Sequence, residues 1–107
     1  MTGTRQRRPR TLEEAFGQVV LSKREMKGLS QMDLAVASGY SLRYIGDVER
    51  GTKSATMRTM NDLATLLDSS LGALLIEAEE LLVSSRKFRK AARSNKVKSS
   101  TQFKAMP

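Results

Sequence analysis

The segment SGYSLRYIGDVERG, residues 38–51, contains side chains suited to contacts with another molecule. Arg43 and Asp47 are charged, whereas Leu42 and Tyr44 are bulky, so these residues of one short helix do not all fit a core. A guanidinium presents a fork of hydrogen-bond donors, and a carboxylate presents acceptors. Because such groups pair with polar groups outside the protein, we predict that this segment is a binding surface.

The composition argues against an enzyme and against a metal centre. The 107 residues include no Cys and no His, so the chain lacks thiolate metal ligands and the most common general base. The sequence has no Gly-rich phosphate loop. We therefore expect no catalytic residue, no metal and no cofactor.

Basic residues outnumber acidic ones and gather toward both ends of the chain. The 19 Lys and Arg against 11 Asp and Glu give a formal charge of +8. Residues 1–28 hold seven basic and three acidic side chains, and residues 70–107 hold eight and three. This balance favours a polyanionic partner, nucleic acid before an anionic membrane surface. No apolar run approaches the roughly 20 residues of a membrane span, so we expect a cytoplasmic protein without a membrane partner.

Apolar periodicity predicts an all-α fold of five consecutive helices, because no sustained alternation indicates a strand. A side chain that can cap a helix precedes each of them: Thr11, Ser30, Ser41, Thr56 and Ser70. The last helix is the longest, and its pattern reaches Phe88. We divide the chain into a basic arm (residues 1–10), a folded domain (11–85) and a basic tail (86–107).

The spacing within the second and third predicted helices is typical of two helices joined by a tight turn. Ala35 supplies a small residue where the helix axes approach, and Gly39 can take the positive φ that the turn needs. Ile45 and Val48 provide the apolar inner face of the third helix. Counted from Gln31, these four residues are the fifth, ninth, fifteenth and eighteenth. The pattern predicts a helix-turn-helix, whose second helix enters the DNA major groove.

The stretches GLSQMDLAVASGY and YIGDVERG resemble the lambda-repressor/Cro-like (XRE-type) helix-turn-helix family, over roughly Phe16 to Leu75. The resemblance implies a five-helix DNA-binding domain that acts as a homodimer on a partly palindromic operator. It also implies that Arg24 pairs with Glu49 and holds the recognition helix on its scaffold. The size and the long last helix are similar to those of restriction–modification controller proteins.

The resemblance further implies that four residues read DNA bases: Ser41, Leu42, Arg43 and Asp47. A guanidinium that forks onto guanine is worth roughly 1–3 kcal/mol of discrimination, which makes Arg43 the principal candidate. Asp47 is expected to accept from a cytosine amino group, and Leu42 to contact a thymine methyl. On a helix that begins at Leu42, the residues facing away from the core are expected to be Leu42, Arg43, Gly46, Asp47 and Arg50. The alternative is a surface pair of Arg43 with Asp47, worth only about 0.2–0.5 kcal/mol.

Six further residues are expected to contact the DNA backbone: Ser30, Gln31, Tyr44, Arg50, Lys53 and Arg58. Gln31 matches the phosphate clamp of the family, at a helix start where backbone amides also face phosphate. The alternative is that Gln31 is a generic polar residue at this position. Tyr44 is expected to lie over the backbone, and the side chains of Lys53 and Arg58 to reach phosphates.

The last predicted helix carries more apolar residues than one buried stripe requires. Ile76 and Val83, seven residues apart, add a second apolar line on another side. We expect a dimer interface formed by Leu71, Leu75, Ile76, Leu82 and Val83. Such a dimer would set two recognition helices about 34 Å apart, one turn of DNA. The alternative is that the helix packs entirely on its own domain.

The sequence therefore predicts a sequence-specific regulator of transcription that binds double-stranded DNA as a homodimer. One alternative is an antitoxin-like or adaptor protein, whose last helix and basic tail bind a protein partner. Another is an RNA-binding helper that uses the basic ends.

Overall fold

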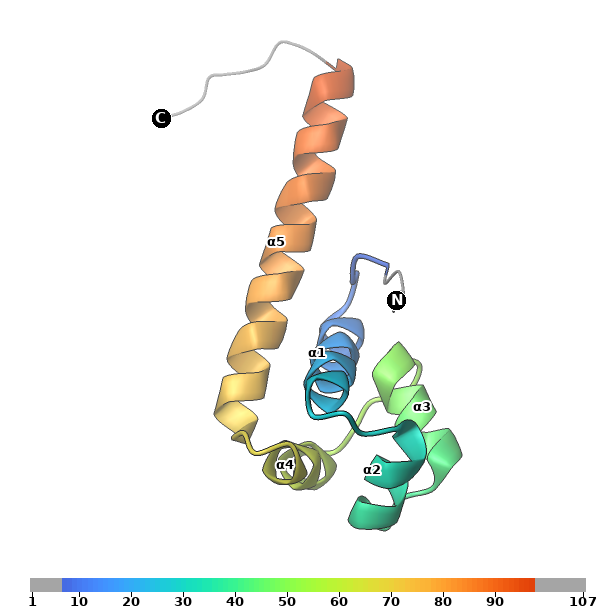
Figure 1. Ribbon diagram of the computed structural model, residues 1–107. Helices are drawn as coiled ribbons and strands as arrows, with labels where there is room; N and C mark the ends of the chain where they lie inside the picture. Colours follow the sequence, from blue (N-terminus) through green and yellow to red (C-terminus); the bar gives the residue numbers. More distant parts are fainter. Residues whose placement is uncertain (1–6, 98–107) are drawn as a thin grey trace.

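The structure, a computed structural model, describes residues 7–97 of the chain. Within these residues it contains five helices and no strand, which confirms the predicted all-α fold (Figure 1). The helices are α1 (Leu12–Met26), α2 (Gln31–Ser38), α3 (Leu42–Arg50), α4 (Met57–Leu66) and α5 (Leu71–Val97).

Local hydrogen bonds explain where the helices begin. Each predicted cap accepts a hydrogen bond from a backbone N–H three residues further on: Thr11, Ser30, Ser41, Thr56 and Ser70. At α2 the bond is reciprocal, because the Asp33 carboxylate accepts from the Ser30 backbone N–H at 2.8 Å. Gly39 and Gly51 end α2 and α3 with φ of 82° and 75°, which residues with a Cβ rarely adopt.

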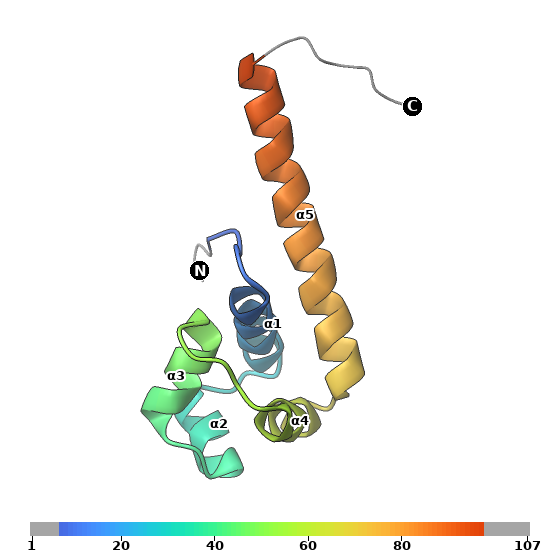
Figure 2. The same ribbon diagram turned by 180° about the vertical axis from the view of Figure 1, so that it is seen from behind.

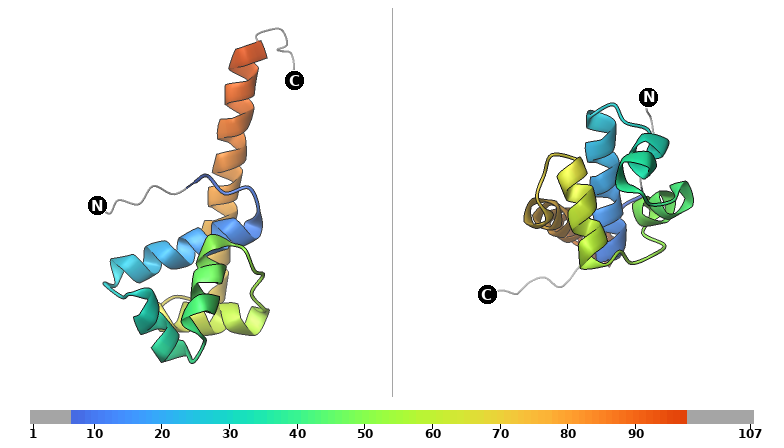
Figure 3. Two further views of the ribbon diagram at one scale, coloured as in Figure 1. Left: turned by 90° about the vertical axis from the view of Figure 1, so that its right-hand side faces the viewer. Right: turned by 90° about the horizontal axis from the view of Figure 1, so that it is seen from below.

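Helix α1 lies between α5 on one side and the α2–α3 pair on the other, and α4 crosses beneath the start of α5 (Figures 1 and 3). The core joins all five helices, and its largest fully buried apolar side chains are Val20, Leu34, Ile45, Val48, Leu63 and Leu74. Burial of each such side chain contributes about 1.5–3 kcal/mol. The α2–α3 pair, which forms the predicted helix-turn-helix, thus rests on a scaffold made by α1, α4 and the first half of α5.

Helix α5 is longer than the sequence analysis predicted. It continues beyond Phe88 to Val97, so the expected boundary between residues 85 and 86 falls inside it. Figure 2 shows its second half running past the other helices. This half contains no Gly or Pro and is rich in Arg, Lys and Ala, which favour helix without help from burial. Residues 1–6 of the predicted arm and 98–107 of the predicted tail lie outside the described residues.

Candidate nucleic-acid interface

The inner face of α3 packs tightly against α1. Ile45 and Val48 are buried, with exposed fractions of 0% and 2%. A Cβ at Gly17 of α1 would collide with the backbone carbonyl oxygens of Val48 and Glu49. The two helices therefore touch backbone to backbone at Gly17, and only glycine fits at this crossing.

A buried ion pair joins the end of α3 to α1. Arg24 donates through Nε to Glu49 Oε2 at 2.7 Å and through Nη2 to Glu49 Oε1 at 3.0 Å. The Arg24 side chain is 8% exposed and the Glu49 side chain 3%. The hydrogen bond to Glu49 raises the pKa of Arg24, so the guanidinium stays charged. Arg24 also donates to the Leu29 carbonyl at 2.8 Å, which ties the α1–α2 turn into the same cluster.

Gln31, which is predicted to contact a phosphate, also joins the buried cluster of Arg24 and Glu49. Its Nε2 donates to Glu49 Oε1 at 2.8 Å, and its side chain remains partly exposed. The first backbone N–H groups of a helix have no acceptor within the helix. In α2 one of them, the Asp33 N–H, donates a hydrogen bond to the hydroxyl of the capping residue Ser30. The start of α2 is therefore fixed to α3 by a side chain while its amide end faces outward.

The start of α3 presents exposed side chains. Ser41, Leu42 and Arg43 are exposed, and Leu42 retains 42% of its surface. Tyr44 is half-buried, with its ring centroid 5.4 Å from that of Tyr40. An exposed guanidinium beside an exposed apolar side chain suits contact with the edges of bases, which offer the acceptors of guanine and the methyl group of thymine.

The expectation that Asp47 faces outward is wrong. Asp47 is 8% exposed, and its Oδ1 accepts from Arg50 Nη2 at 2.6 Å and from Thr52 Oγ1 at 3.3 Å. Lys53 Nζ lies 4.0 Å from its Oδ2. The chain reverses at Gly51, and this reversal brings the later residues over the short carboxylate. Between described residues Asp47 pairs with these cations and not with Arg43, so the alternative surface pair is not formed either.

Gly46 is also buried, contrary to the expectation from helix geometry, because the Arg50 side chain covers it. A Cβ at Gly46 would lie 3.1 Å from Arg50 Nη1. The guanidinium of Arg50 therefore lies along α3 and is held there by Asp47. Lys53 and Arg58 are exposed in the α3–α4 loop and at the start of α4, within the same part of the molecule.

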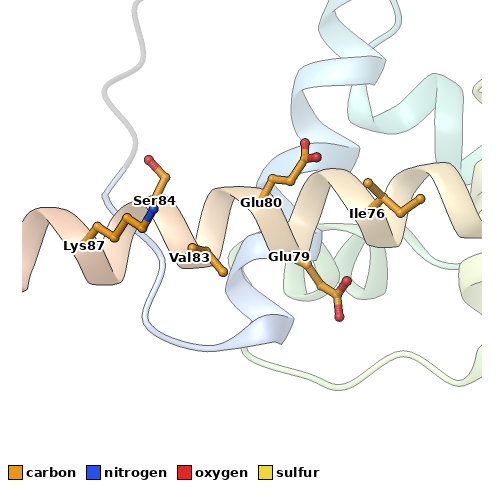
Figure 4. A pocket seen from close by; sticks show the side chains of 6 residues that line it. All are labelled: Ile76, Glu79, Glu80, Val83, Ser84 and Lys87. Atoms are coloured by element: carbon orange, nitrogen blue, oxygen red, sulfur yellow. The ribbon is translucent and has the colours of Figure 1, made fainter. Parts of the chain in front are cut away.

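The predicted dimer interface on α5 divides into two sets. Leu82 is only 7% exposed and packs in the core of its own chain, so it offers little surface to the predicted interface. Leu71 and Leu75 are partly buried. Ile76 and Val83 are 57% and 47% exposed. Figure 4 shows these two on an open groove of α5, which is lined by Ile76, Glu79, Glu80, Val83, Ser84 and Lys87.

Sequence reasoning missed the close approach at Gly17 and the cations around Asp47. A glycine within a helical pattern is a signal for the first, because it costs about 1 kcal/mol relative to Ala and a close backbone approach is a reason for its presence. For the second, the i, i+3 spacing of Asp47 and Arg50 on one helix is a signal for their pair, whereas Lys53 comes near Asp47 because the chain turns at Gly51.

The described part of the chain has neither a group of metal-ligating side chains nor a helix that could span a membrane. In residues 7–97, no three or more His, Cys, Asp or Glu side chains are grouped so as to hold a metal ion. None of the helices described there combines the length and the apolar character needed to cross a membrane.

Comparisons with known proteins agree with this geometry. Residues 20–74 match the helix-turn-helix family, and the chain belongs to this family, in its XRE-type branch. Control protein C.SmaI of Serratia marcescens is 39% identical over 64 residues, which cover 60% of this chain and 76% of that protein. Membership makes the chain a DNA-binding regulator of transcription, and C.SmaI is a control protein by name.

Two solved structures extend the comparison to the fold. The restriction–modification controller C.AhdI of Aeromonas hydrophila has a TM-score of 0.55 and 41% identity, over 57% of this chain and 92% of that one. The clp gene regulator ClgR of Corynebacterium glutamicum has a TM-score of 0.75 and 31% identity, over 81% of this chain and 92% of that one. The similarity to ClgR therefore extends over more of this chain than the similarity to C.AhdI.

Proposed function

We propose that this protein binds a partly palindromic duplex operator as a homodimer and selects it through the start of α3. The observation that carries this proposal is the contrast on α3, whose inner face is locked to α1 while Ser41, Leu42 and Arg43 are exposed. In this proposal Arg43 forks onto guanine and Leu42 contacts a thymine methyl. By name, one relative is a restriction–modification controller and another a clp gene regulator, which supports a role in gene regulation. We place the protein in the cytoplasm, associated with the nucleoid.

Backbone contacts hold the reading helix in register on the DNA. We assign them to the start of α2 and to the basic residues that follow α3: Ser30, Gln31, Tyr44, Arg50, Lys53 and Arg58. Asp47 takes a different role from that expected from sequence. Its carboxylate holds Arg50 along α3, so Asp47 acts as a positioning residue and not as a base reader.

Selection of bound duplexes from a random pool tests the assignment, with wild type, Arg43→Ala and Arg58→Ala at one salt concentration. Wild type is expected to enrich a two-fold symmetric site. Arg43→Ala loses preference at one base pair in each half-site, whereas Arg58→Ala lowers affinity about equally for all sequences. Enrichment of the same site by wild type and Arg43→Ala would contradict the role of Arg43.

The homodimer is proposed to form through the exposed line of Ile76 and Val83 on α5. Sedimentation of the full chain tests this with Ile76→Glu/Val83→Glu, matched by Met32→Glu/Val36→Glu, which alters exposed apolar residues of α2. The α5 variant is expected to sediment as a monomer and the α2 variant as a dimer. A wild-type monomer would contradict the homodimer and favour a protein partner on this groove.

A further inference from the structure

Residues 7–10 are fastened to α5 by contacts between distant parts of the chain. Pro9 is fully buried, and its carbonyl oxygen accepts from Ser85 Oγ at 2.9 Å and from Arg89 Nη1 at 3.2 Å. Ser85 is itself 2% exposed, and Arg89 Nη1 also donates to Ser85 Oγ at 2.8 Å. These bonds fix the backbone of the segment beside the middle of α5 (Figure 1).

The neighbouring residues of the segment are held as well. The Arg8 guanidinium carbon lies 3.7 Å from the centroid of the Phe88 ring, which is a cation–π contact. The Arg7 carbonyl accepts from Gln18 Nε2, and the Arg10 backbone N–H donates to Glu14 Oε1 at 2.8 Å. The described part of the arm is therefore a defined structure on the surface of the domain.

This arrangement gathers positive charge in one place. Arg7, Arg8, Arg10 and Arg89 line a cleft of about 350 Å³ together with Glu14. Four arginines thus line the cleft together with one glutamate. None of the ion pairs between residues 7–97 includes any of these arginines. The cleft has an excess of positive charge that no described acidic side chain neutralises.

The cleft lies next to the end of the recognition helix. Glu14, one of its lining residues, also packs against Gly51, the residue that ends α3, because a Cβ there would lie 2.6 Å from the Glu14 Cα. Figure 3 shows the start of α1 close to this end of α3. An anion in the cleft would therefore lie beside the end of α3, at the opposite end of the helix from Leu42 and Arg43.

We propose that this cleft is a phosphate-binding site that lies outside the helix-turn-helix. Guanidinium forks match the oxygen geometry of phosphate, and a bound phosphate would relieve the repulsion among the arginines. The phosphate is carried either by duplex DNA that flanks the site read by α3 or by a free polyphosphate. The DNA source rests on the proposed function, whereas the free source does not.

The test removes charge without disturbing the contacts of the arm. Arg7 and Arg10 are exposed and make their hydrogen bonds through the backbone, so Arg7→Gln/Arg10→Gln should keep the fold. The matched control is Arg86→Gln/Lys90→Gln, which removes two exposed charges of α5 outside the cleft. Circular dichroism checks that both variants keep their helix content.

Two binding measurements distinguish the sources. Calorimetry with tripolyphosphate should show at least about a tenfold loss of affinity for the cleft variant if the site takes a free polyphosphate. Titration of the selected duplex, with long and with short flanks over a salt series, reports on the DNA source. If that source holds, the slope of log K against log salt falls by about 2 for the cleft variant on the long duplex.

Loss in either measurement that is confined to the cleft variant supports the site and identifies its ligand. Equal losses in the cleft and control variants would overturn it, because the effect would then follow net charge and not position. No loss in both measurements would also overturn it. Failure of wild type to select any duplex would refute the proposed function and leave the tripolyphosphate result as a separate test.

Discussion

The two ends of α3 are held in opposite ways. At its start, Leu42 and Arg43 are exposed, whereas at its end Val48 is buried against α1 and Glu49 is paired with Arg24. A side chain that reads a base needs a fixed backbone beneath it, since small displacements weaken paired hydrogen bonds. The buried end supplies that fixed backbone, and the exposed end is thereby available to an external partner.

The two ion pairs of α3 also differ in burial, and therefore in how much each contributes to the free energy of unfolding. The side chains of Arg24 and Glu49 are 8% and 3% exposed, whereas Arg50 in its pair with Asp47 is 61% exposed. Removal of one partner from a buried pair leaves an uncompensated charge in a poorly solvated place, and costs far more than the same change at the surface. The first pair therefore governs stability, and the second governs where one cation lies.

Glu49→Ala, at the buried end of α3, should lower the stability of the protein more than any other change considered. The variant leaves the Arg24 guanidinium buried without its carboxylate, so the free energy of unfolding should fall by about 3–5 kcal/mol. Urea denaturation followed by circular dichroism measures the change. The control Glu25→Ala, an exposed residue of α1 beside Arg24, should change stability by no more than about 0.5 kcal/mol. Equal losses in the two variants would show that the contact itself contributes little.

Gly17→Ala should weaken the same end through packing and not through charge. The added Cβ meets the carbonyl oxygens of Val48 and Glu49, so α3 must move from α1 at a cost of about 1–3 kcal/mol. Gly72→Ala in the first turn of α5 is the matched control, because a Cβ there meets no atom within 4 Å. Thermal unfolding should show stabilisation of the control by up to about 1 kcal/mol. A stable Gly17→Ala variant would refute the close crossing.

Asp47→Asn should affect the exposed side of the helix more than its stability. The change releases Arg50 and Lys53, which are assigned to the DNA backbone, so affinity for selected and for random duplex should fall by about the same factor, up to about fivefold. The titrations should use one salt concentration for both duplexes. A loss confined to the selected duplex would contradict the positioning role, because it would indicate that Asp47 reads a base.

Asp33→Asn should give the smallest effect and a distinct pH dependence. The Ser30 backbone N–H, and then the Ser30 side chain, lower the pKa of Asp33 by hydrogen bonding to its carboxylate. The folded state therefore favours the charged form, and this stabilisation is present above the ordinary Asp pKa and lost as pH falls through the lowered value. Urea denaturation should show a gap between wild type and variant at pH 7 that narrows in acid. A gap independent of pH would contradict this explanation.

The predictable features of the fold are those that depend on contacts between residues close together in the sequence. The five caps and the turns at Gly39 and Gly51 depend on groups within about four positions, and sequence reasoning placed them where the structure has them. The same applies to the apolar spacing of Ile45 and Val48. The burial of Asp47 was not predictable in this way, because it depends on how the chain continues after α3.

The sequence by itself determined the helices, their starts and the register of the helix-turn-helix, because hydrogen bonds and side-chain periodicity along a helix are local. Only the tertiary structure decided which residues of these helices are available to a partner. Leu82 and Val83 are adjacent, yet one is in the core and the other on the surface. Pro9 and Ser85 are 76 residues apart and share a hydrogen bond. Burial and charge clustering arise from contacts between distant segments, and local patterns do not specify these.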